Sequence, residues 1–149
     1  TLKLSYSFGS RDVEGLFYDY SGDQIVMVTK NRSGNNQSKV FTVDPAKSSQ
    51  TVTALSDFPL AGMNSSLDLI TGADANELGE VVLRTYDDLI FFSWSASGLT
   101  FKNSFSFADQ KKGEAIVYSR NNKKLYSIGE GKKRPLYEID LELYKTCNP

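Results

Sequence analysis

The sequence predicts an all-β fold, a β-propeller of about three four-stranded blades that cannot close a ring by themselves. The first observation behind this prediction is a module that occurs about three times, with copies that begin near residues 12, 71 and 113. The second is that Tyr, Phe, Val, Ile and Thr gather in short runs bounded by Gly, Asn, Asp, Pro and Ser, the pattern of strands and turns. A repeat of about fifty residues made of short strands is typical of a propeller blade.

The first and third copies of the module are the most alike. Asp-Val-Glu-Gly-Leu-Phe-Tyr at 12–18 leads into Ile-Val-Met-Val-Thr-Lys at 25–30, and Gly-Glu-Ala-Ile-Val-Tyr at 113–118 leads into Leu-Tyr-Ser-Ile-Gly-Glu at 125–130. Both copies contain Glu-x-x-x-Tyr. The looser copy between them is Thr-Gly-Ala-Asp at 71–74 followed by Gly-Glu-Val-Val-Leu-Arg-Thr-Tyr at 79–86.

The turn signals divide the chain into one half-propeller domain over 1–149. We expect residues 11–57 and 66–107 to form two complete blades, residues 111–149 an incomplete blade, and residues 1–10 the outer strand of a neighbouring blade. The expected strands lie near 13–18, 24–30, 38–43 and 50–56, then near 67–72, 80–85, 88–94 and 99–105, and finally near 113–118, 123–128 and 134–140.

The strand at 2–8 alternates between apolar and polar residues, so it is a half-buried strand. It has no hairpin partner, while the third blade lacks a fourth strand. Three blades make an open arc whose two ends are exposed, and exposed sheet edges promote association. We therefore expect a second chain to complete the ring. That chain is either a separate N-terminal half or a second copy joined by two-fold symmetry.

Composition excludes several classes of function. The net charge is −1, so no global field attracts nucleic acid. No apolar run approaches the roughly 20 residues of a membrane span. The chain has no histidine and one cysteine, which excludes histidine-based triads, dyads and zinc sites within it. Because the chain begins at Thr1, we expect a mature product or a fragment.

An extracellular location is predicted from three asparagines in the N-glycosylation pattern, all in expected loops: Asn31, Asn36 and Asn64. Polar turn composition is the alternative explanation of these matches. Cys147, near the C-terminus, is a candidate for an interchain disulfide, and an incidental free thiol is its alternative.

Charged residues recur at the ends of the expected inner strands, where side chains would line the central channel. The channel-lining candidates are Glu14, Asp74 and Glu114 on the first strands and Lys30, Arg84 and Glu130 at the ends of the second strands. We favour a structural ion-pair network that orients adjacent blades, because buried charges must be paired. The alternative takes the three acids as oxygen ligands of an axial Ca²⁺ ion.

The motifs Asp-Val-Glu-Gly-Leu…Val-Thr-Lys at 12–30, Thr-Gly-Ala-Asp…Leu-Arg-Thr-Tyr at 71–86 and Gly-Glu-Ala-Ile…Pro-Leu-Tyr at 113–137 occur in this order. In this the chain resembles a poorly characterised family of secreted β-propeller proteins, over roughly residues 12–140. The resemblance implies a six-bladed propeller of which this chain is the C-terminal half. No established catalytic residues come with the family.

Three classes of function follow. The favoured one is an extracellular, non-enzymatic binding or structural protein with a protein or glycan ligand, because the chain lacks a nucleophile–base pair. The second is a calcium-dependent hydrolase of the propeller lactonase or esterase type. The third is a lectin in which Trp94 or tyrosines stack on sugar rings. For Trp94 and the pair Phe91 and Phe92, packing between blades is the favoured role.

Overall fold

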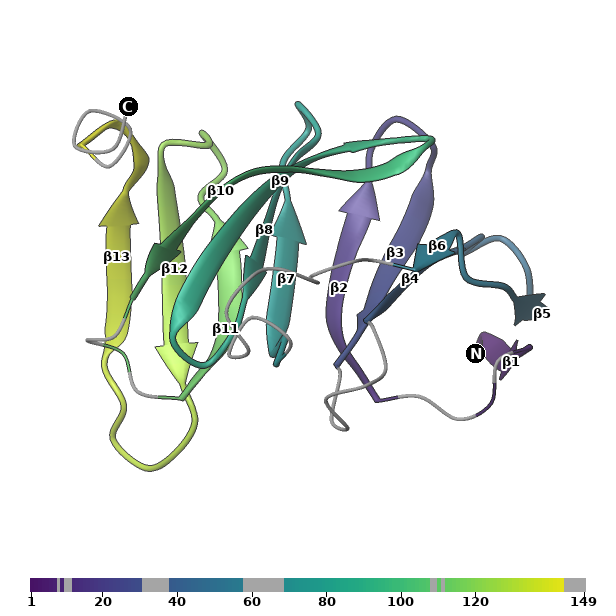
Figure 1. The fold of residues 1–149 in the computed structure, drawn as a ribbon, viewed down its shortest axis with the longest axis horizontal. Helices are drawn as coiled ribbons and strands as arrows, with labels where there is room; N and C mark the ends of the chain where they lie inside the picture. The colour runs from purple at the N-terminus through teal and green to yellow at the C-terminus, as the bar shows by residue number, and fades with distance from the viewer. Residues whose placement is uncertain are drawn as a thin grey trace.

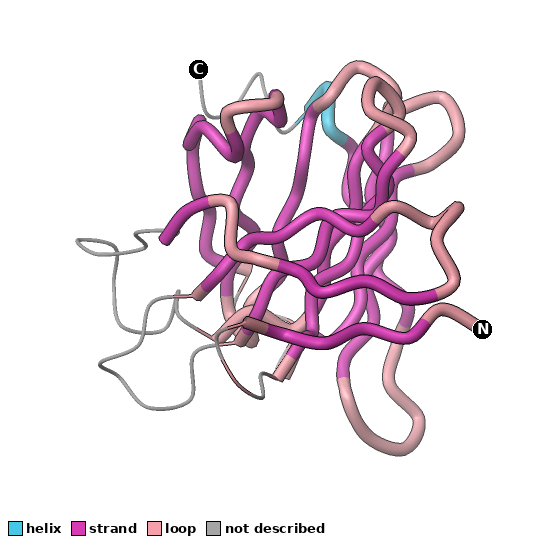
Figure 2. The backbone as a smooth tube through the Cα atoms, turned by 90° about the vertical axis from the view of Figure 1, so that its right-hand side faces the viewer, coloured by secondary structure: helices cyan, strands magenta, loops and turns pink. Residues whose placement is uncertain are grey.

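The computed structural model describes residues 1–7, 9, 12–30, 38–57, 69–107, 110 and 112–143. Strands dominate this part of the chain, and Figure 2 shows one short helical turn, at 141–143, beside them. Within the described residues, no helix is long and apolar enough to cross a membrane. The predicted all-β class is therefore confirmed.

Three antiparallel sheets lie next to one another as blades (Figure 1). In each blade the strands pair in chain order, so each is a meander that runs from an inner to an outer strand. The first blade contains β2 (Val13–Asp19), β3 (Gln24–Thr29), β4 (Lys39–Val43) and β6 (Ser56–Asp57). The second contains β7 (Gly72–Ala75), β8 (Glu80–Arg84), β9 (Asp88–Ser95) and β10 (Gly98–Ser106), and the third contains β11 (Gly113–Tyr118), β12 (Lys124–Gly129) and β13 (Leu136–Asp140).

Two observed strands differ from the expected ones. The expected strand at 50–56 is divided, because β5 (Ser49–Val52) leaves the first blade and only β6 pairs with β4. The innermost strand of the second blade, expected near 67–72, is β7 instead. Its Gly and Ala residues have low β-propensity, so local preference hides a strand that tertiary packing requires.

The N-terminal strand β1 (Lys3–Tyr6) pairs in parallel with β5 of the same chain, with Leu4 opposite Gln50. The sequence assigned this segment to a neighbouring blade, so the pairing differs from that expectation. The physical reason is a small apolar cluster, in which Leu2, Leu4 and Tyr6 pack against Phe41 and other buried residues of the first blade. The ring of Tyr6 meets that of Phe41 edge to face at 5.3 Å.

The innermost strands converge, since β7 contacts both β2 and β11. The approach depends on small residues. A Cβ atom added to Gly72 would lie 2.7 Å from the backbone oxygen of Glu114, and one added to Gly15 would lie 3.2 Å from the Cβ atom of Ala73. No other residue type fits at Gly72 without displacement of a neighbouring backbone.

Each junction between blades is filled by an apolar core. Phe17 and Val28 of the first blade pack with Leu83 and Ile90 of the second, and a separate cluster joins the second blade to the third. Successive side chains of β9 point to opposite faces. Phe92 and Trp94 therefore face the first blade, and Phe91 faces the third. The expected packing of these aromatic residues between blades is confirmed.

We predict that Gly72→Ala destabilises the chain by about 1–3 kcal/mol, because the new methyl group must displace the backbone of β11. The free energy of unfolding in urea measures the effect. The matched control is Ala115→Ser on the exposed face of β11, where a change within about 0.5 kcal/mol is expected. Equal stability of Gly72→Ala and the wild type would contradict the close approach.

Candidate functional site

Glu14 and Glu114 occupy β-bulges at equivalent places in the first and third blades. The pairing of β2 with β3 shifts between Val13 and Gly15, and the pairing of β11 with β12 shifts between Gly113 and Ala115. In each blade the glutamate is the residue that the shift inserts. A bulge re-aims a side chain and is common beside functional sites. The repeated Glu-x-x-x-Tyr motif predicted the equivalence of the two residues but not the bulges.

Lys30 joins the first blade to the second. Its ammonium nitrogen Nζ lies 3.6 Å from Oε1 of Glu14 and donates a hydrogen bond to the hydroxyl of Tyr86 at 3.2 Å. The same nitrogen lies 4.8 Å from the centre of the Tyr86 ring, within range of a cation–π contact. Only 4% of the Lys30 side chain is exposed. The cation is therefore held by partners from both blades.

The charges of this region act on one another. Burial by itself lowers the pKa of Lys30, but the hydroxyl of Tyr86 and the charges of Glu14 and Glu114 outweigh it, and the pKa is raised. Burial raises the pKa of Glu114, with smaller raising contributions from Glu130 and Glu14 and opposition from Lys30. We call Glu14, Lys30, Tyr86 and Glu114 the axial cluster.

Glu130 lies at the margin of this cluster. Its carboxylate is 3.8 Å from Nζ of Lys112, and both side chains are mostly exposed. Such a surface pair contributes little to stability.

Unlike Glu14 and Glu114, Asp74 does not lie on a β-bulge. In the second blade Gly72 pairs with Arg84 and Asp74 with Val82, without a shift. The carboxylate of Asp74 accepts a hydrogen bond from the backbone N–H of Tyr118 at 2.7 Å. Burial raises the pKa of Asp74, and backbone hydrogen bonds oppose the rise. This residue thus links the second blade to the third.

Arg84 is fully buried at the same junction. Its Nη2 atom donates to the backbone oxygen of Tyr86 and to both oxygens of Gln110, at 3.2–3.3 Å. The guanidinium lies 5.2 Å from the centre of the Phe107 ring. Desolvation lowers the pKa of Arg84 to about 10. A Cβ atom on Gly113 would lie 2.0 Å from Nε of Arg84, so the glycine makes room for the side chain.

These contacts indicate what the predicted candidates do. The structure brings Glu14, Lys30 and Glu114 together, and it places Asp74 and Arg84 in the junction between blades. In the described part of the chain, no group of three Asp, Glu, His or Cys residues is able to hold a metal ion. Lys30 and Glu14 form an ion pair within the first blade, whereas Asp74 and Arg84 are held by hydrogen bonds, and the role predicted for the six candidates as a network between blades stays a prediction.

Tyr86 and Gln110 are partners of the charged residues that the sequence did not predict. Tyr86 ends the Leu-Arg-Thr-Tyr motif, so its position was visible, but its contact with Lys30 spans two blades. Gln110 follows β10 and has no motif. The candidates Asn31, Asn36, Asn64 and Cys147 lie outside the described residues, and their modification stays a prediction.

No protein-family model and no curated protein matches the sequence. Similar solved structures include a gluconolactonase from Xanthomonas campestris, with 11% identity and a TM-score of 0.55, over 89% of this chain and 39% of that one. Another is the extracellular domain of a one-component system from B. thetaiotaomicron, with 16% identity and a TM-score of 0.48, over 93% of this chain and 20% of that one. The likeness to the gluconolactonase confirms a propeller-type fold, and this chain spans about two fifths of that protein's length.

Glu114 generates a pH-dependent prediction. Since its pKa is raised by folding, the stability that it contributes is fully present below the ordinary glutamate value of 4.5 and is lost as pH rises through the higher folded value. In Glu114→Gln, the free energy of unfolding should therefore fall less than in the wild type between pH 4.5 and neutrality. Urea unfolding at a series of pH values measures the difference.

A control of opposite sign is Glu138→Gln. The hydrogen bond from Lys124 lowers the pKa of Glu138, so its contribution is present above 4.5 and is lost as pH falls. The free energy of unfolding of Glu138→Gln should therefore fall less than that of the wild type as the pH drops below 4.5. If the free energies of unfolding of Glu114→Gln and the wild type changed in parallel with pH, the raised pKa of Glu114 would be contradicted.

Asp74 generates a second prediction. Asp74→Ala removes the acceptor of a buried N–H group and should destabilise the chain by about 1–3 kcal/mol, whereas Asp74→Asn retains a side-chain oxygen and should cost less. Urea unfolding measures both, and hydrogen exchange of the Tyr118 amide reports the bond itself. Unchanged exchange of that amide in Asp74→Ala would show that the bond does not protect it.

Proposed function

We propose that this chain is half of a six-bladed propeller that a second chain completes, and that the assembled propeller is an extracellular, non-enzymatic binding or structural protein. The observation that carries the proposal is the free face of the third blade. The strands of this blade alternate, with Ile116, Leu125 and Ile139 buried against the second blade. The opposite face has no blade of the described chain on it.

That opposite face is apolar at its centre. Val117, Ile128 and Leu136 are exposed by 49%, 41% and 65%. The register places Ile128 opposite both Ala115 and Leu136, which form one apolar band across the three strands, and Val117 lies opposite Tyr126 in the next row of the same face. A contiguous exposed apolar patch of this kind is typical of an interaction site. In a longer propeller, the next blade would cover it.

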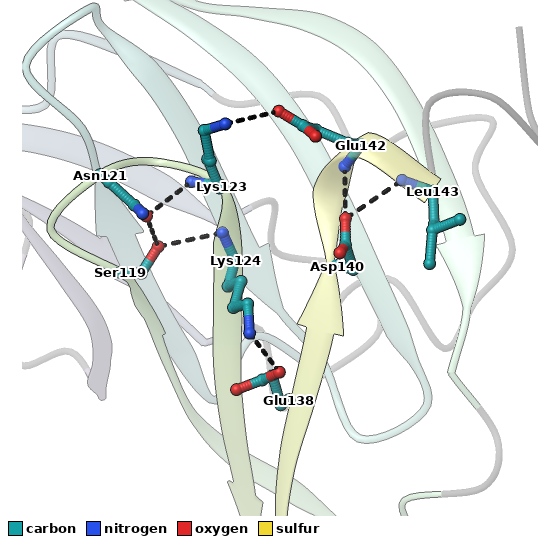
Figure 3. A network of polar contacts seen from close by, with 8 residues as sticks. All are labelled: Ser119, Asn121, Lys123, Lys124, Glu138, Asp140, Glu142 and Leu143. Atoms are coloured by element: carbon teal, nitrogen blue, oxygen red, sulfur yellow. Dashed lines mark hydrogen bonds and ion pairs between the residues drawn. The ribbon is translucent and has the colours of Figure 1, made fainter.

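Charged side chains lie beside the band, at the end of the third blade where β12 begins and β13 ends. Figure 3 shows Lys124 paired with Glu138 and Lys123 paired with Glu142. Asp140 accepts hydrogen bonds from the backbone N–H groups of Glu142 and Leu143 and so holds the turn that follows β13. An apolar centre with a polar rim is the usual anatomy of a protein interface.

The other end of the row of blades also has a partly uncovered face. On the first blade, β1 and β5 cover the region of Phe41 and Val43, whereas Leu16 and Tyr18 on the innermost strand are exposed by 52% and 38%. Within the chain, one face of a blade packs against the opposite face of the next blade at both junctions. A partner built of similar blades would fit both ends, and it is either a separate half or a second copy.

A binding or structural role is supported over catalysis by the axial cluster, in which Lys30 is held by Glu14 and Tyr86, and by the absence of histidine from the sequence. A calcium-dependent hydrolase has less support, because the described residues contain no metal-binding group. The gluconolactonase shares 11% identity with this chain, which carries the fold and not the activity.

We predict that Val117→Asp abolishes association with the partner, because it puts a charge on the exposed apolar face, next to the row of Ala115, Ile128 and Leu136. Native mass spectrometry of the purified protein measures the assembly, and a mass of two equal chains distinguishes a second copy from a separate half. The control is Leu78→Asp, which alters a side chain that is 75% exposed and outside both end faces. A wild-type protein that is a single chain at all concentrations would overturn the proposal.

A further inference from the structure

The two ends of the row of blades are the opposite halves of one kind of junction (Figure 1). The bulged residues Glu14 and Glu114 align β2 with β11. Leu16, two positions after the first bulge, is 52% exposed, whereas its equivalent Ile116 is 7% exposed against the second blade. The first blade therefore exposes a side chain that the third blade buries.

The other face of these strands shows the reverse. Phe17 is 1% exposed in the core between the first two blades, whereas its equivalent Val117 is 49% exposed. On the second strands, Val28 is fully buried, whereas Ile128 at the same place in the register is 41% exposed. The third blade therefore exposes the side chains that the first blade buries.

We propose that the partner of this chain is a second copy of it, and that the third blade of each copy packs on the first blade of the other. This inference rests on the proposed half-propeller and names the chain that completes it. The two exposed end faces are apolar, as are the faces that meet at the junction of the first two blades. Two copies related by a two-fold axis use each end once and leave neither end uncovered.

The position of β1 suits the third blade as the neighbour of the first. Leu16, Met27 and Phe41 form one row across the first blade. The ring of Tyr6 in β1 covers the outer end of this row at Phe41, while Leu16 at the inner end is exposed. For a blade that packs on Leu16, β1 therefore occupies the place of the outer strand. In the described part of the chain the third blade has three strands, β11, β12 and β13, so it fits beside β1.

β1 also offers an edge for pairing. The N–H group of Lys3 donates to the backbone oxygen of Ser48 at 2.9 Å, on the side of β5. Successive N–H groups of a strand point to opposite edges, so the N–H group of Leu4 points away from β5. A strand edge of this kind is a template for another strand. The geometry assigns β13 of the second copy to it, antiparallel to β1, as in the meander of each blade.

The charges at the two ends are complementary. On the third blade, an open hollow of about 590 Å³ has Arg120, Lys124 and Tyr126 in its lining. At the equivalent turn of the first blade, Tyr20 and Asp23 are exposed. Within the chain, turns of neighbouring blades meet, since the β2–β3 and β7–β8 turns line one cavity. The same arrangement between copies places Arg120 of one beside Asp23 of the other, and such complementary charges favour this pairing.

Mixing of two variants tests the junction. Leu16→Asp and Val117→Asp each put a charge into both junctions of a dimer, so each variant alone should be monomeric. In a mixture, the third blade of Leu16→Asp and the first blade of Val117→Asp are unaltered, so one junction forms. With one variant labelled with ¹⁵N, native mass spectrometry should show a dimer of one labelled and one unlabelled chain. Its dissociation constant should exceed that of the wild-type dimer by about tenfold or more, because one junction is lost.

Ile128→Asp is the matched control for this mixture. It alters the same end face as Val117→Asp, so a mixture of these two variants contains no intact junction and should stay monomeric. Mixed dimers in both mixtures, or in neither, would overturn the packing of the third blade on the first.

Hydrogen exchange tests the pairing of β13 with β1. The amide of Leu4 should exchange about tenfold more slowly, or slower still, in the wild-type dimer than in the Val117→Asp monomer. The amide of Lys3 bonds within the chain and is the internal control, with equal rates expected in both proteins. Equal rates for Leu4 as well would overturn the strand pairing.

The wild-type protein separates this inference from the proposed function. A dimer of two equal chains supports both. A wild-type chain bound to a different chain would overturn the second copy and keep the half-propeller, whereas a single chain at all concentrations would overturn both.

Discussion

The close approach of the innermost strands is the constraint on which the rest of this structure depends. β7 can lie against β2 and β11 because Gly15 and Gly72 have no Cβ atom, and Gly72 faces a backbone oxygen that cannot move alone. This convergence sets the wedge between blades that Phe17, Phe92 and Trp94 fill on one side of β9 and Phe91 fills on the other. The bulky residues of β2 and β9 that fill the junctions therefore depend on glycines at the axis.

The same convergence brings charges from different blades together. Lys30 reaches Tyr86, and Asp74 reaches the backbone of Tyr118, because the strand ends lie close at the centre. Buried charges with partners of this kind add little net stability, whereas removal of one partner is strongly destabilising. The apolar cores fill both junctions between blades, and these polar contacts cross the same junctions.

Local sequence patterns predicted the positions of most strands. Residue alternation and turn residues located the strands from 13 to 19, 80 to 106 and 113 to 140 within a few residues, because period and turn chemistry are local properties. The innermost strand of the second blade was misplaced, since Gly72 and Ala73 are small for tertiary reasons. The pairing of β1 with β5 was also missed, because parallel pairing between distant segments leaves no local signal.

By itself, the sequence determined the repeat, the all-β class and the equivalence of Glu14 with Glu114. Only the tertiary structure decided which charges meet. It placed both glutamates on bulges, joined Lys30 to Tyr86, buried Arg84 beside Gly113, and separated Asp74 from the axial cluster. The reason is that composition and period are properties of one segment, whereas these contacts arise where strands far apart in the chain converge.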